Sequence, residues 1–280
     1  MEIRKRYIDL LKMALLNEHY LENELRIQAL AEGWVQGKSL LNRRIAYEKL
    51  HNIKKYYASE FELMKERRNE GRHLAEGSQH LVYAHTMIGR KRMDNIQRCF
   101  EQLISENIQG DLIECGVWNG GATIFMAGLL QAYQEHDRKV WVADSFDGVP
   151  VPELEEDKEF DISKKVFPGL AVGLEEVKNN FDKYDLLKEN VEFLPGLFSS
   201  TLPNAPINEI AVLRLDGDLY ESTMDSLNAL YDRVVSGGFV IVDDYGVLPP
   251  CKKAVDEFRE KRNISNSYQW IDWSGIYWRK

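Results

Sequence analysis

Apolar residues in the N-terminal quarter of the chain are spaced as they are on helices. Ile8, Leu11, Leu15 and Leu16 recur at helical intervals, and a second periodic stretch covers residues 40–64. Apolar residues three or four positions apart lie on one face of an α-helix. The pattern therefore predicts a helical N-terminal region, which could act as a lid, as a substrate-selecting cap or as a dimerisation arm.

A polar stretch at Glu76-Gly77-Ser78 marks the predicted end of this region. Beyond it, short apolar runs alternate with segments of helical pattern, which favours strands and helices in turn. At 280 residues the chain exceeds the usual size of one domain. We therefore predict two parts: an N-terminal helical lid or dimerisation region (1–76) and a main domain (77–280).

The alternation in the main domain predicts the α/β class, because repeated strand–helix units build a parallel sheet with helices on both faces. Residues 268–273 and 275–278 are typical of a β-hairpin. We thus expect a doubly wound, mostly parallel sheet with a C-terminal antiparallel hairpin and an N-terminal helical extension. The expected strands are 112–115, 140–143, 191–194, 210–215 and 239–242, and the expected helices are 93–105, 122–133, 174–182 and 222–235.

Composition supports a folded protein of the cytoplasm. A hydrophobic content of 44% and an aromatic content of 11% indicate a well-buried core. No apolar run is long enough to span a membrane, and the N-terminus is too polar for a secretion signal. Cys99, Cys115 and Cys251 are widely separated and odd in number, which indicates reduced thiols.

The net charge of −9 argues against non-specific binding to nucleic acids or to anionic membranes. The charge is uneven: residues 1–100 hold 19 Lys+Arg against 13 Asp+Glu, and residues 101–280 hold 17 against 32. Two solvated surfaces of opposite sign explain this most simply. The alternative is that the basic front part docks on the acidic back part, within or between subunits.

A glycine-rich segment follows the first expected strand and carries Glu114, Gly116, Gly120 and Gly121. Such loops bring backbone amides close to a ligand at the carboxyl end of a parallel sheet. Glu114 would repel a pyrophosphate but suits the cationic methionine end of S-adenosylmethionine. The spacing also differs from the Gly-x-Gly-x-x-Gly of dinucleotide-binding loops. The alternative is a tight strand–helix turn in which Asn119 caps the helix.

Asp144 ends the second expected strand, 30 residues after Glu114. An acidic side chain at this position accepts hydrogen bonds from ribose hydroxyls in nucleotide-binding sheets. Alone, Asp144 could equally cap a turn, but together with Glu114 it favours ribose binding.

Four aspartates follow the last two parallel strands: Asp216 and Asp218 after one, Asp243 and Asp244 after the other. If these strands are neighbours, the carboxylates meet beside the glycine-rich loop, which is costly unless a cation lies among them. Oxygen ligands suit Mg²⁺, with Mn²⁺ or Ca²⁺ as alternatives. We predict that Asp216, Asp243 and Asp244 bind the ion, and Asp218 could share the site. The alternative is a set of solvated aspartates that cap the following helices.

An acidic insert at residues 150–173 is long for a loop in a compact domain. Long loops are often lids over a site. A mobile, solvated loop with no catalytic role is an equally good interpretation.

With these motifs, the chain resembles the macrocin O-methyltransferase family, whose members methylate sugar hydroxyls on glycosylated natural products. The resemblance runs in order over nearly the whole chain and is weakest in the N-terminal third. The matching segments are 7–12 (YIDLLK), 86–89 (TMIG), 110–121 (GDLIECGVWNGG), 144–148 (DSFDG), 201–203 (TLP), 215–223 (LDGDLYEST) and 237–245 (GGFVIVDDY).

The resemblance implies a class I methyltransferase fold, S-adenosylmethionine as methyl donor, and Mg²⁺ held by three aspartates of which one is the general base. It also implies a small-molecule hydroxyl acceptor and a homodimer or higher oligomer whose N-terminal segments help cover the site. By motif, Asp216 is the base, with Asp218 as the alternative. The residues expected to bind the cofactor are Met87, Glu114, Gly116, Gly120, Gly121, Asp144, Ser145 and Phe146.

Three other functions are compatible with parts of the pattern. A methyltransferase of the same fold acting on a catechol or another phenol would use the same acidic motifs. A nicotinamide-dependent oxidoreductase would share the sheet, but Glu114 in the loop argues against it. A cofactor-free scaffold would have no use for four clustered carboxylates.

Overall fold

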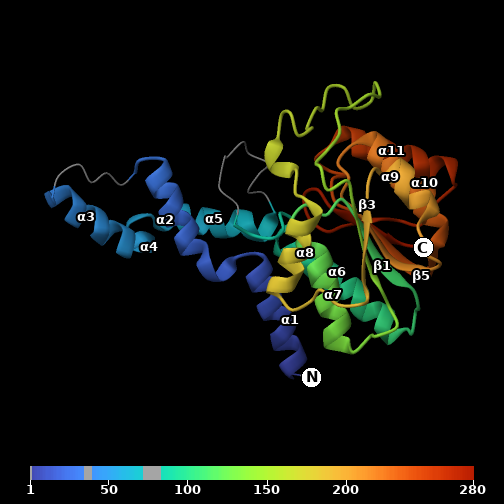
Figure 1. Ribbon diagram of the computed structural model, residues 1–280, viewed down its shortest axis with the longest axis horizontal. Helices are drawn as coiled ribbons and strands as arrows, with labels where there is room; N and C mark the ends of the chain where they lie inside the picture. Colours follow the sequence, from blue (N-terminus) through green and yellow to red (C-terminus); the bar gives the residue numbers. More distant parts are fainter. Residues whose placement is uncertain (1, 35–39, 72–82) are drawn as a thin grey trace.

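The computed structural model describes residues 2–34, 40–71 and 83–280 (Figure 1). Within these residues one seven-stranded sheet has the order β3-β2-β1-β4-β5-β7-β6. Strands β1 to β5 are parallel, and β7 pairs with β5 and with β6 in antiparallel fashion. The strands are β1 (Asp111–Cys115), β2 (Val140–Asp144), β3 (Val191–Pro195), β4 (Ile210–Leu215), β5 (Val234–Val242), β6 (Gln269–Trp270) and β7 (Ile276–Arg279).

Helices cover both faces of this sheet, as expected for a doubly wound α/β fold. Along β1, Leu112 packs with α1, α6, α7 and α8, whereas its neighbour Ile113 packs with α10 and α11. Successive strand residues point to opposite faces, so both residues are buried. The helices are α1 (Glu2–Leu15), α2 (Leu21–Ala31), α3 (Leu40–His51), α4 (Ile53–Tyr56), α5 (Ala58–Glu70), α6 (Gly89–Ser105), α7 (Gly121–Tyr133), α8 (Leu174–Lys183), α9 (Phe198–Thr201), α10 (Tyr220–Leu230) and α11 (Pro249–Lys261).

The fold class predicted from the alternation is confirmed, with β4 at its predicted bounds. The start of β5 was predicted wrongly: the strand begins at Val234 rather than at Phe239. Gly237 has a φ of 86°, and the pairing with β4 shifts register between Ile210 and Val212. The glycine pair thus makes an irregularity inside the strand, and not the turn before it that the sequence indicated.

Helix α11 was not predicted. Its sequence carries a signal, because Pro249 and Pro250 occupy the first turn, where proline is tolerated. Its apolar residues Cys251, Val255 and Phe258 are spaced by three or four positions and are buried. The expected helix over 222–235 also ends earlier, at Leu230, and is followed by a 3₁₀ turn and then β5.

The N-terminal region is helical, as predicted, but it has two unlike parts (Figure 1). Helix α1 packs on the body: Ile8, Leu11 and Leu15 belong to the same buried cluster as α7. Helices α2 to α5 form an arm that projects from the body, with its own small core around Leu25 and Ile53.

A buried arginine joins the arm to the residue that follows α1. The buried Arg68 of α5 donates hydrogen bonds to Glu24 of α2 (2.6 Å) and to the carbonyl oxygen of Leu16 (2.6 Å).

The predicted domain boundary at residues 76–78 lies outside the described residues, so the division into 1–76 and 77–280 stays a prediction. In the part of the chain that the structure covers, no helix has both the length and the apolar character needed to cross a bilayer.

Candidate active site

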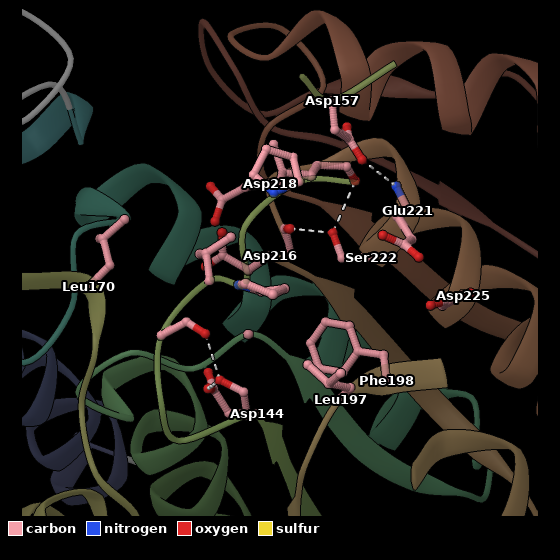
Figure 2. Close-up of a pocket in the computed structure, with 18 of the residues that line it drawn as sticks. Asp144, Asp157, Leu170, Leu197, Phe198, Asp216, Asp218, Glu221, Ser222 and Asp225 are labelled. Atoms are coloured by element: carbon pink, nitrogen blue, oxygen red, sulfur yellow. Dashed lines mark hydrogen bonds between the residues drawn. The ribbon is translucent and has the colours of Figure 1, made fainter. Parts of the chain in front are cut away.

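A cavity of about 310 Å³ lies at the carboxyl ends of the parallel strands (Figure 2). Loops after β1, β2, β3 and β4 form its wall, together with the insert after β2. This is where open α/β sheets bind their ligands. Lining residues from the predicted set are Met87, Gly116, Asp144, Ser145 and Asp216.

The loop after β1 passes very close to the loop after β4. Gly116 has a φ of 89°, and a Cβ built on it would lie 1.9 Å from the carbonyl oxygen of Asp216. A side chain at this position would therefore push apart the two loops that carry the predicted cofactor-binding and metal-binding residues. The glycine that the sequence singled out brings the two motifs together.

Gly121 plays a similar part on the other side of the loop. A Cβ there would lie 2.2 Å from the carbonyl oxygen of His85 and 2.6 Å from the Cβ of Thr86. The start of α7 can therefore approach the segment that carries Met87, which lines the cavity. The preceding residue, Gly120, is the N-cap of α7 with a φ of 82° and makes no side-chain cap. The alternative of an Asn119 cap is thus not what the structure has.

Asp144 ties together the loops that follow β1 and β2. Its Oδ2 accepts a hydrogen bond from the backbone N–H of Val117 (2.8 Å), and its Oδ1 accepts one from Phe146 (2.8 Å). The carboxylate lines the cavity and is only partly buried, so it also faces the space where a ligand would lie. Phe146 is not among the residues that line the cavity, and its ring packs on Phe193 with ring centroids 6.2 Å apart.

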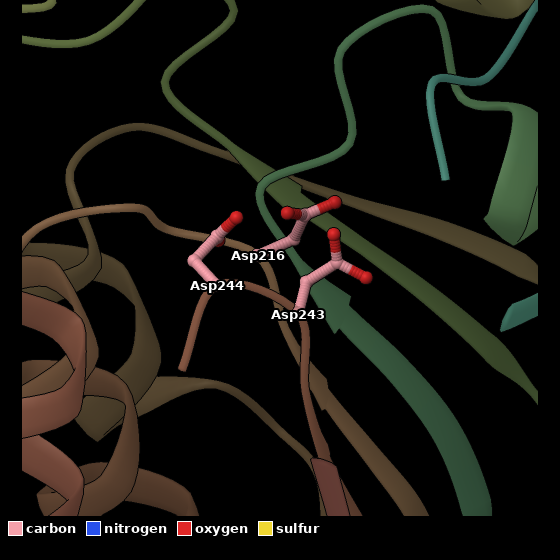
Figure 3. A group of neighbouring side chains, drawn as sticks. All are labelled: Asp216, Asp243 and Asp244. Atoms are coloured by element: carbon pink, nitrogen blue, oxygen red, sulfur yellow. The ribbon is translucent and has the colours of Figure 1, made fainter. Parts of the chain in front are cut away.

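Asp216, Asp243 and Asp244 come together as the sequence predicted (Figure 3). Each offers one carboxylate oxygen, and these oxygens lie within 4.8 Å of one another. Strands β4 and β5 are neighbours, which is why residues that are 27 positions apart meet. Asp216 also lines the cavity, as does Asp218, whose backbone turns with a φ of 64°.

Two buried arginines lie among these carboxylates, and the sequence analysis missed both. Arg214 of β4 donates hydrogen bonds to Glu114, to Asp216 (2.8 Å) and to Asp243. Arg92 of α6 donates to Asp243 and, through Nε, to Asp272 (2.8 Å). Arg92 is thus a basic residue of the front part that docks on buried acidic residues of the back part.

Arg92 and Arg214 balance only part of the negative charge of these carboxylates. Burial raises the pKa of Asp244 well above its usual range, and the nearby Asp218 and Asp216 add to the effect. Burial, followed by Asp216 and Asp243, likewise raises the pKa of Asp218. In addition, Oδ2 of Asp244 is buried with no hydrogen-bond partner among the described residues. The cluster therefore has a surplus of carboxylate charge that a further cation would stabilise.

Glu114 is buried and is not among the residues that line the cavity. It is 1% exposed, is the cross-strand register partner of Arg214, and accepts a hydrogen bond from that residue. Burial raises the pKa of Glu114 to about 8; Arg214 lowers this pKa, and the nearby Asp216 and Asp243 raise it. A direct contact of Glu114 with the cofactor stays a prediction, as it does for Gly120, Gly121 and Phe146.

The acidic insert contributes to the cavity wall and is anchored to the start of α10. Asp157 is 1% exposed and accepts hydrogen bonds from the backbone N–H groups of Tyr220 (2.7 Å) and Glu221 (3.1 Å), at the start of α10 (Figure 2). Residues 150–153 of the insert and Leu170 line the cavity. The insert thus forms part of the cavity wall, and Asp157 fixes it to the body. The lid interpretation stays a prediction.

The loop after β3 is a part of the wall that the sequence analysis did not single out. Gly196, Leu197, Phe198 and Ser199 line the cavity. Phe198 lies close to Gly217, between Asp216 and Asp218, because a Cβ built on Gly217 would be 3.2 Å from its ring. Gly196 has a φ of 130°, which favours glycine. A Gly directly after a strand was the signal that could have identified this loop, and Phe198 offers an aromatic face to a ligand.

Comparisons with known proteins agree with this geometry. The profile of the family described as Macrocin-O-methyltransferase (TylF) matches residues 4–280. The chain is 52% identical over 225 residues to demethyldecarbamoylnovobiocin O-methyltransferase of Streptomyces niveus, covering 76% of this chain and 80% of the relative. Over 199 residues it is 48% identical to 8-demethyl-8-(2,3-dimethoxy-alpha-L-rhamnosyl)-tetracenomycin-C 4'-O-methyltransferase of Streptomyces olivaceus, covering 70% and 76%. The solved structure of the O-methyltransferase NovP superposes with a TM-score of 0.79 at 42% identity and 99% coverage of both chains.

Proposed function

The chain belongs to the macrocin O-methyltransferase family and is an S-adenosylmethionine-dependent O-methyltransferase, and from this premise we propose its acceptor and its metal. We propose that it methylates a hydroxyl of a sugar on a glycosylated natural product, with Mg²⁺ bound by Asp216, Asp243 and Asp244. The observation that carries the metal assignment is the convergence of three carboxylate oxygens within 4.8 Å beside the cavity.

The residues present fit a small divalent cation. All three proposed ligands offer oxygen, the donor that Mg²⁺ prefers. Oδ2 of Asp244 is buried and has no partner in the described chain. The two arginines in the cluster carry two positive charges against the carboxylates of Glu114, Asp216, Asp243 and Asp272, before Asp218 and Asp244 are counted. Negative charge is therefore left over for a metal.

The proposed acceptor rests on the relatives. The name of the tetracenomycin relative includes a rhamnosyl group, and that of the novobiocin relative names an antibiotic. The rhamnosyl group supports a small glycosylated acceptor over a free catechol. The family also supports methyl transfer over hydride transfer to a nicotinamide, the alternative that the sheet alone left open.

Each part of the cavity has a proposed task. When bound, S-adenosylmethionine supplies the methyl group of its sulfonium, and Mg²⁺ lowers the pKa of a coordinated hydroxyl. Asp144 accepts hydrogen bonds from the ribose hydroxyls, and Gly116 and Met87 line the adjoining space. Asp216 takes the proton from the acceptor hydroxyl, because it belongs both to the carboxylate cluster and to the cavity wall. The loops that carry Gly116 and Asp216 hold donor and acceptor in line, and such positioning supplies much of the rate.

Two neighbouring aspartates test the assignment of the base. Asp216→Asn removes the proposed proton acceptor and should lower kcat by about 10²- to 10⁴-fold, with S-adenosylhomocysteine affinity changed little. Asp218→Asn is the matched control: it removes the same charge two residues away, and we expect it to retain kcat within tenfold. Single-turnover rates with a glycosylated acceptor would measure both. A larger loss in Asp218→Asn than in Asp216→Asn would move the base to Asp218.

Calorimetry tests the metal independently of turnover. We expect Mg²⁺ to bind the wild-type protein with one site, and Asp244→Asn to weaken this binding because the ligand with the unpartnered oxygen is lost. Dialysis against a chelator should abolish methyl transfer, and added Mg²⁺ should restore it. Full activity in chelator would remove the metal from the proposed function and leave the methyltransferase assignment intact.

A further inference from the structure

One buried guanidinium contacts carboxylates from three adjacent strands. Arg214 of β4 is fully buried and pairs in register with Glu114 of β1, on the same face of the sheet as Asp216 two residues later. On its other side, Arg214 pairs in register with Ile241 of β5, two residues before Asp243. Its side chain donates to all three carboxylates. It thus lies where the carboxyl ends of β1, β4 and β5 meet.

The three proposed metal ligands differ in how the protein holds them. Asp243 accepts from Arg214 through Oδ1 and from Arg92 through Oδ2, so both of its oxygens are fixed. Asp216 accepts from Arg214 through Oδ2 (2.8 Å) and is 25% exposed toward the cavity. Asp244 is buried, and its Oδ2 has no partner in the described residues. Asp243 is therefore held through both oxygens, Asp216 through one, and the Oδ2 of Asp244 is not held by any described residue.

Three carboxylates this close repel one another, and without a counter-charge their side chains would turn apart. A guanidinium presents five donors in a rigid plane and can bridge several carboxylates at once, which the single ammonium of lysine cannot do. Side chains that orient metal ligands from outside the coordination shell determine affinity as strongly as some ligands do.

We propose that Arg214 is the positioning residue of the metal site: it holds Asp216 and Asp243 together before an ion binds and leaves Asp244 free to capture it. The inference rests on the proposed metal site. Arg92 supports it from behind by fixing the second oxygen of Asp243. The site is then preformed in the metal-free protein, with one guanidinium bonded to Glu114, Asp216 and Asp243.

The proposal predicts an effect opposite in sign to simple electrostatics. Removing a positive charge beside a cation site should by charge alone tighten metal binding. If Arg214 positions the ligands, its removal instead weakens binding, by about 10- to 100-fold as for other residues that orient metal ligands. The direction of the change in Kd therefore separates the two roles.

The decisive variant is the double substitution Glu114→Gln with Arg214→Gln. It removes the guanidinium together with the Glu114 carboxyl group that would otherwise be left without its partner in the core, so it is more able to fold than Arg214→Gln alone. We expect Mg²⁺ to bind it at least tenfold more weakly than the wild type in calorimetry. Arg214→Lys keeps the positive charge but loses the planar set of guanidinium donors. Its Mg²⁺ affinity should lie between those of the wild type and the double variant. Equal Mg²⁺ affinity in the wild type and in both variants would overturn the proposal.

Arg138→Gln is the matched control. Arg138 is 3% exposed and donates to the carbonyl oxygens of Gly110 (2.7 Å) and Ile108 (2.6 Å), at the opposite end of β1. We expect this variant to be less stable but to bind Mg²⁺ like the wild type. A loss of Mg²⁺ binding in Arg138→Gln equal to that in the double variant would show a general effect of destabilisation and would overturn the proposal.

A crystal structure of the double variant in chelator gives a readout that needs no metal. We expect the Asp216 and Asp243 carboxylates to separate beyond the 4.8 Å span that they keep in the wild type. An unchanged cluster in this structure would overturn the positioning role. If the wild type bound no Mg²⁺, the proposed metal site would fail, and the metal-free structure would still decide whether Arg214 positions the aspartates.

Discussion

At the scale of single residues, the carboxylates at the carboxyl ends of the central strands have too few positive charges beside them to balance their own. Arg214 shares one positive charge among Glu114, Asp216 and Asp243. A buried carboxylate that is only partly compensated retains its proton to higher pH. The folded protein without metal therefore binds protons here that the unfolded chain releases.

Glu114 makes this measurable as a pH dependence. Its pKa is raised from 4.5 to about 8 by burial. Because the folded state then holds more protons than the unfolded state, the free energy of unfolding falls as pH rises between these values, by at most about 1.4 kcal/mol per pH unit for one proton. Glu114→Gln cannot lose a proton, so its stability relative to the wild type should rise from pH 5 to pH 8.

Urea unfolding of the metal-free protein at several pH values would measure this difference. Glu189→Gln, at an exposed position, serves as the control and should follow the wild-type pH profile. If the difference between Glu114→Gln and the wild type did not change with pH, Glu114 would be charged in the folded protein at pH 5, against the expected effect of burial.

At the scale of elements, the start of α10 depends on a residue from another part of the chain. The N-cap residue of α10 is Leu219, which has no side-chain oxygen to accept from the first backbone N–H groups. Asp157, over sixty residues earlier, accepts from two of them. A carboxylate at this position also interacts favourably with the positive end of the helix dipole. The insert and α10 therefore stabilise each other.

Asp157→Ala should cost about 1–2 kcal/mol in the free energy of unfolding, the range for loss of a helix cap. It should also raise the KM for S-adenosylmethionine, because residues 150–153 of the insert line the cavity. Asp157→Asn should lower the free energy of unfolding less than Asp157→Ala does, since asparagine also caps helices. Thermal unfolding and steady-state kinetics would measure both effects.

Glu155→Ala, at an exposed position of the same insert, is the control and should match the wild type. A KM unchanged in Asp157→Ala would mean that the insert holds its place in the cavity wall without this contact.

At the scale of the whole molecule, the projecting arm of α2 to α5 leaves apolar side chains in solvent. Tyr47 and Leu63 are 75% and 45% exposed. Exposed apolar side chains on a projecting element are favourable contacts for a second subunit. The homo-oligomer expected from the sequence stays a prediction, and the arm is where we expect its interface.

Leu63→Glu should therefore shift the protein toward monomers in sedimentation experiments, with the thermal midpoint of the dilute monomer unchanged because Leu63 is exposed. Glu66→Lys, on the exposed surface of the same helix, is the control and should keep the wild-type assembly. A monomeric wild type, or a dimer that Leu63→Glu leaves intact, would place the interface elsewhere or remove it.

The sequence by itself determined the fold class and the identity of the acidic site. Strand periodicity, glycines after strands and aspartates at strand ends are local signals, because they depend on residues close together in the chain. Parallel topology then places all strand ends at one edge. The meeting of Asp216, Asp243 and Asp244 also requires β4 and β5 to be neighbours, which the structure shows. Gly116 and Asp144 were likewise placed at the cavity by local motifs, and Met87 and Ser145 by the resemblance to the macrocin O-methyltransferase family.

Only the tertiary structure decided how the charges at that edge are compensated and what holds the insert in the cavity wall. Arg92 and Arg214 look like ordinary basic residues in the sequence, yet burial in the sheet and register with Glu114 make them the internal cations of the site. Asp157 looks like one acid in a solvated insert, and a contact more than sixty residues away makes it a helix cap. Charge pairing and capping between distant segments depend on distances that folding sets, and periodicity carries no information about them.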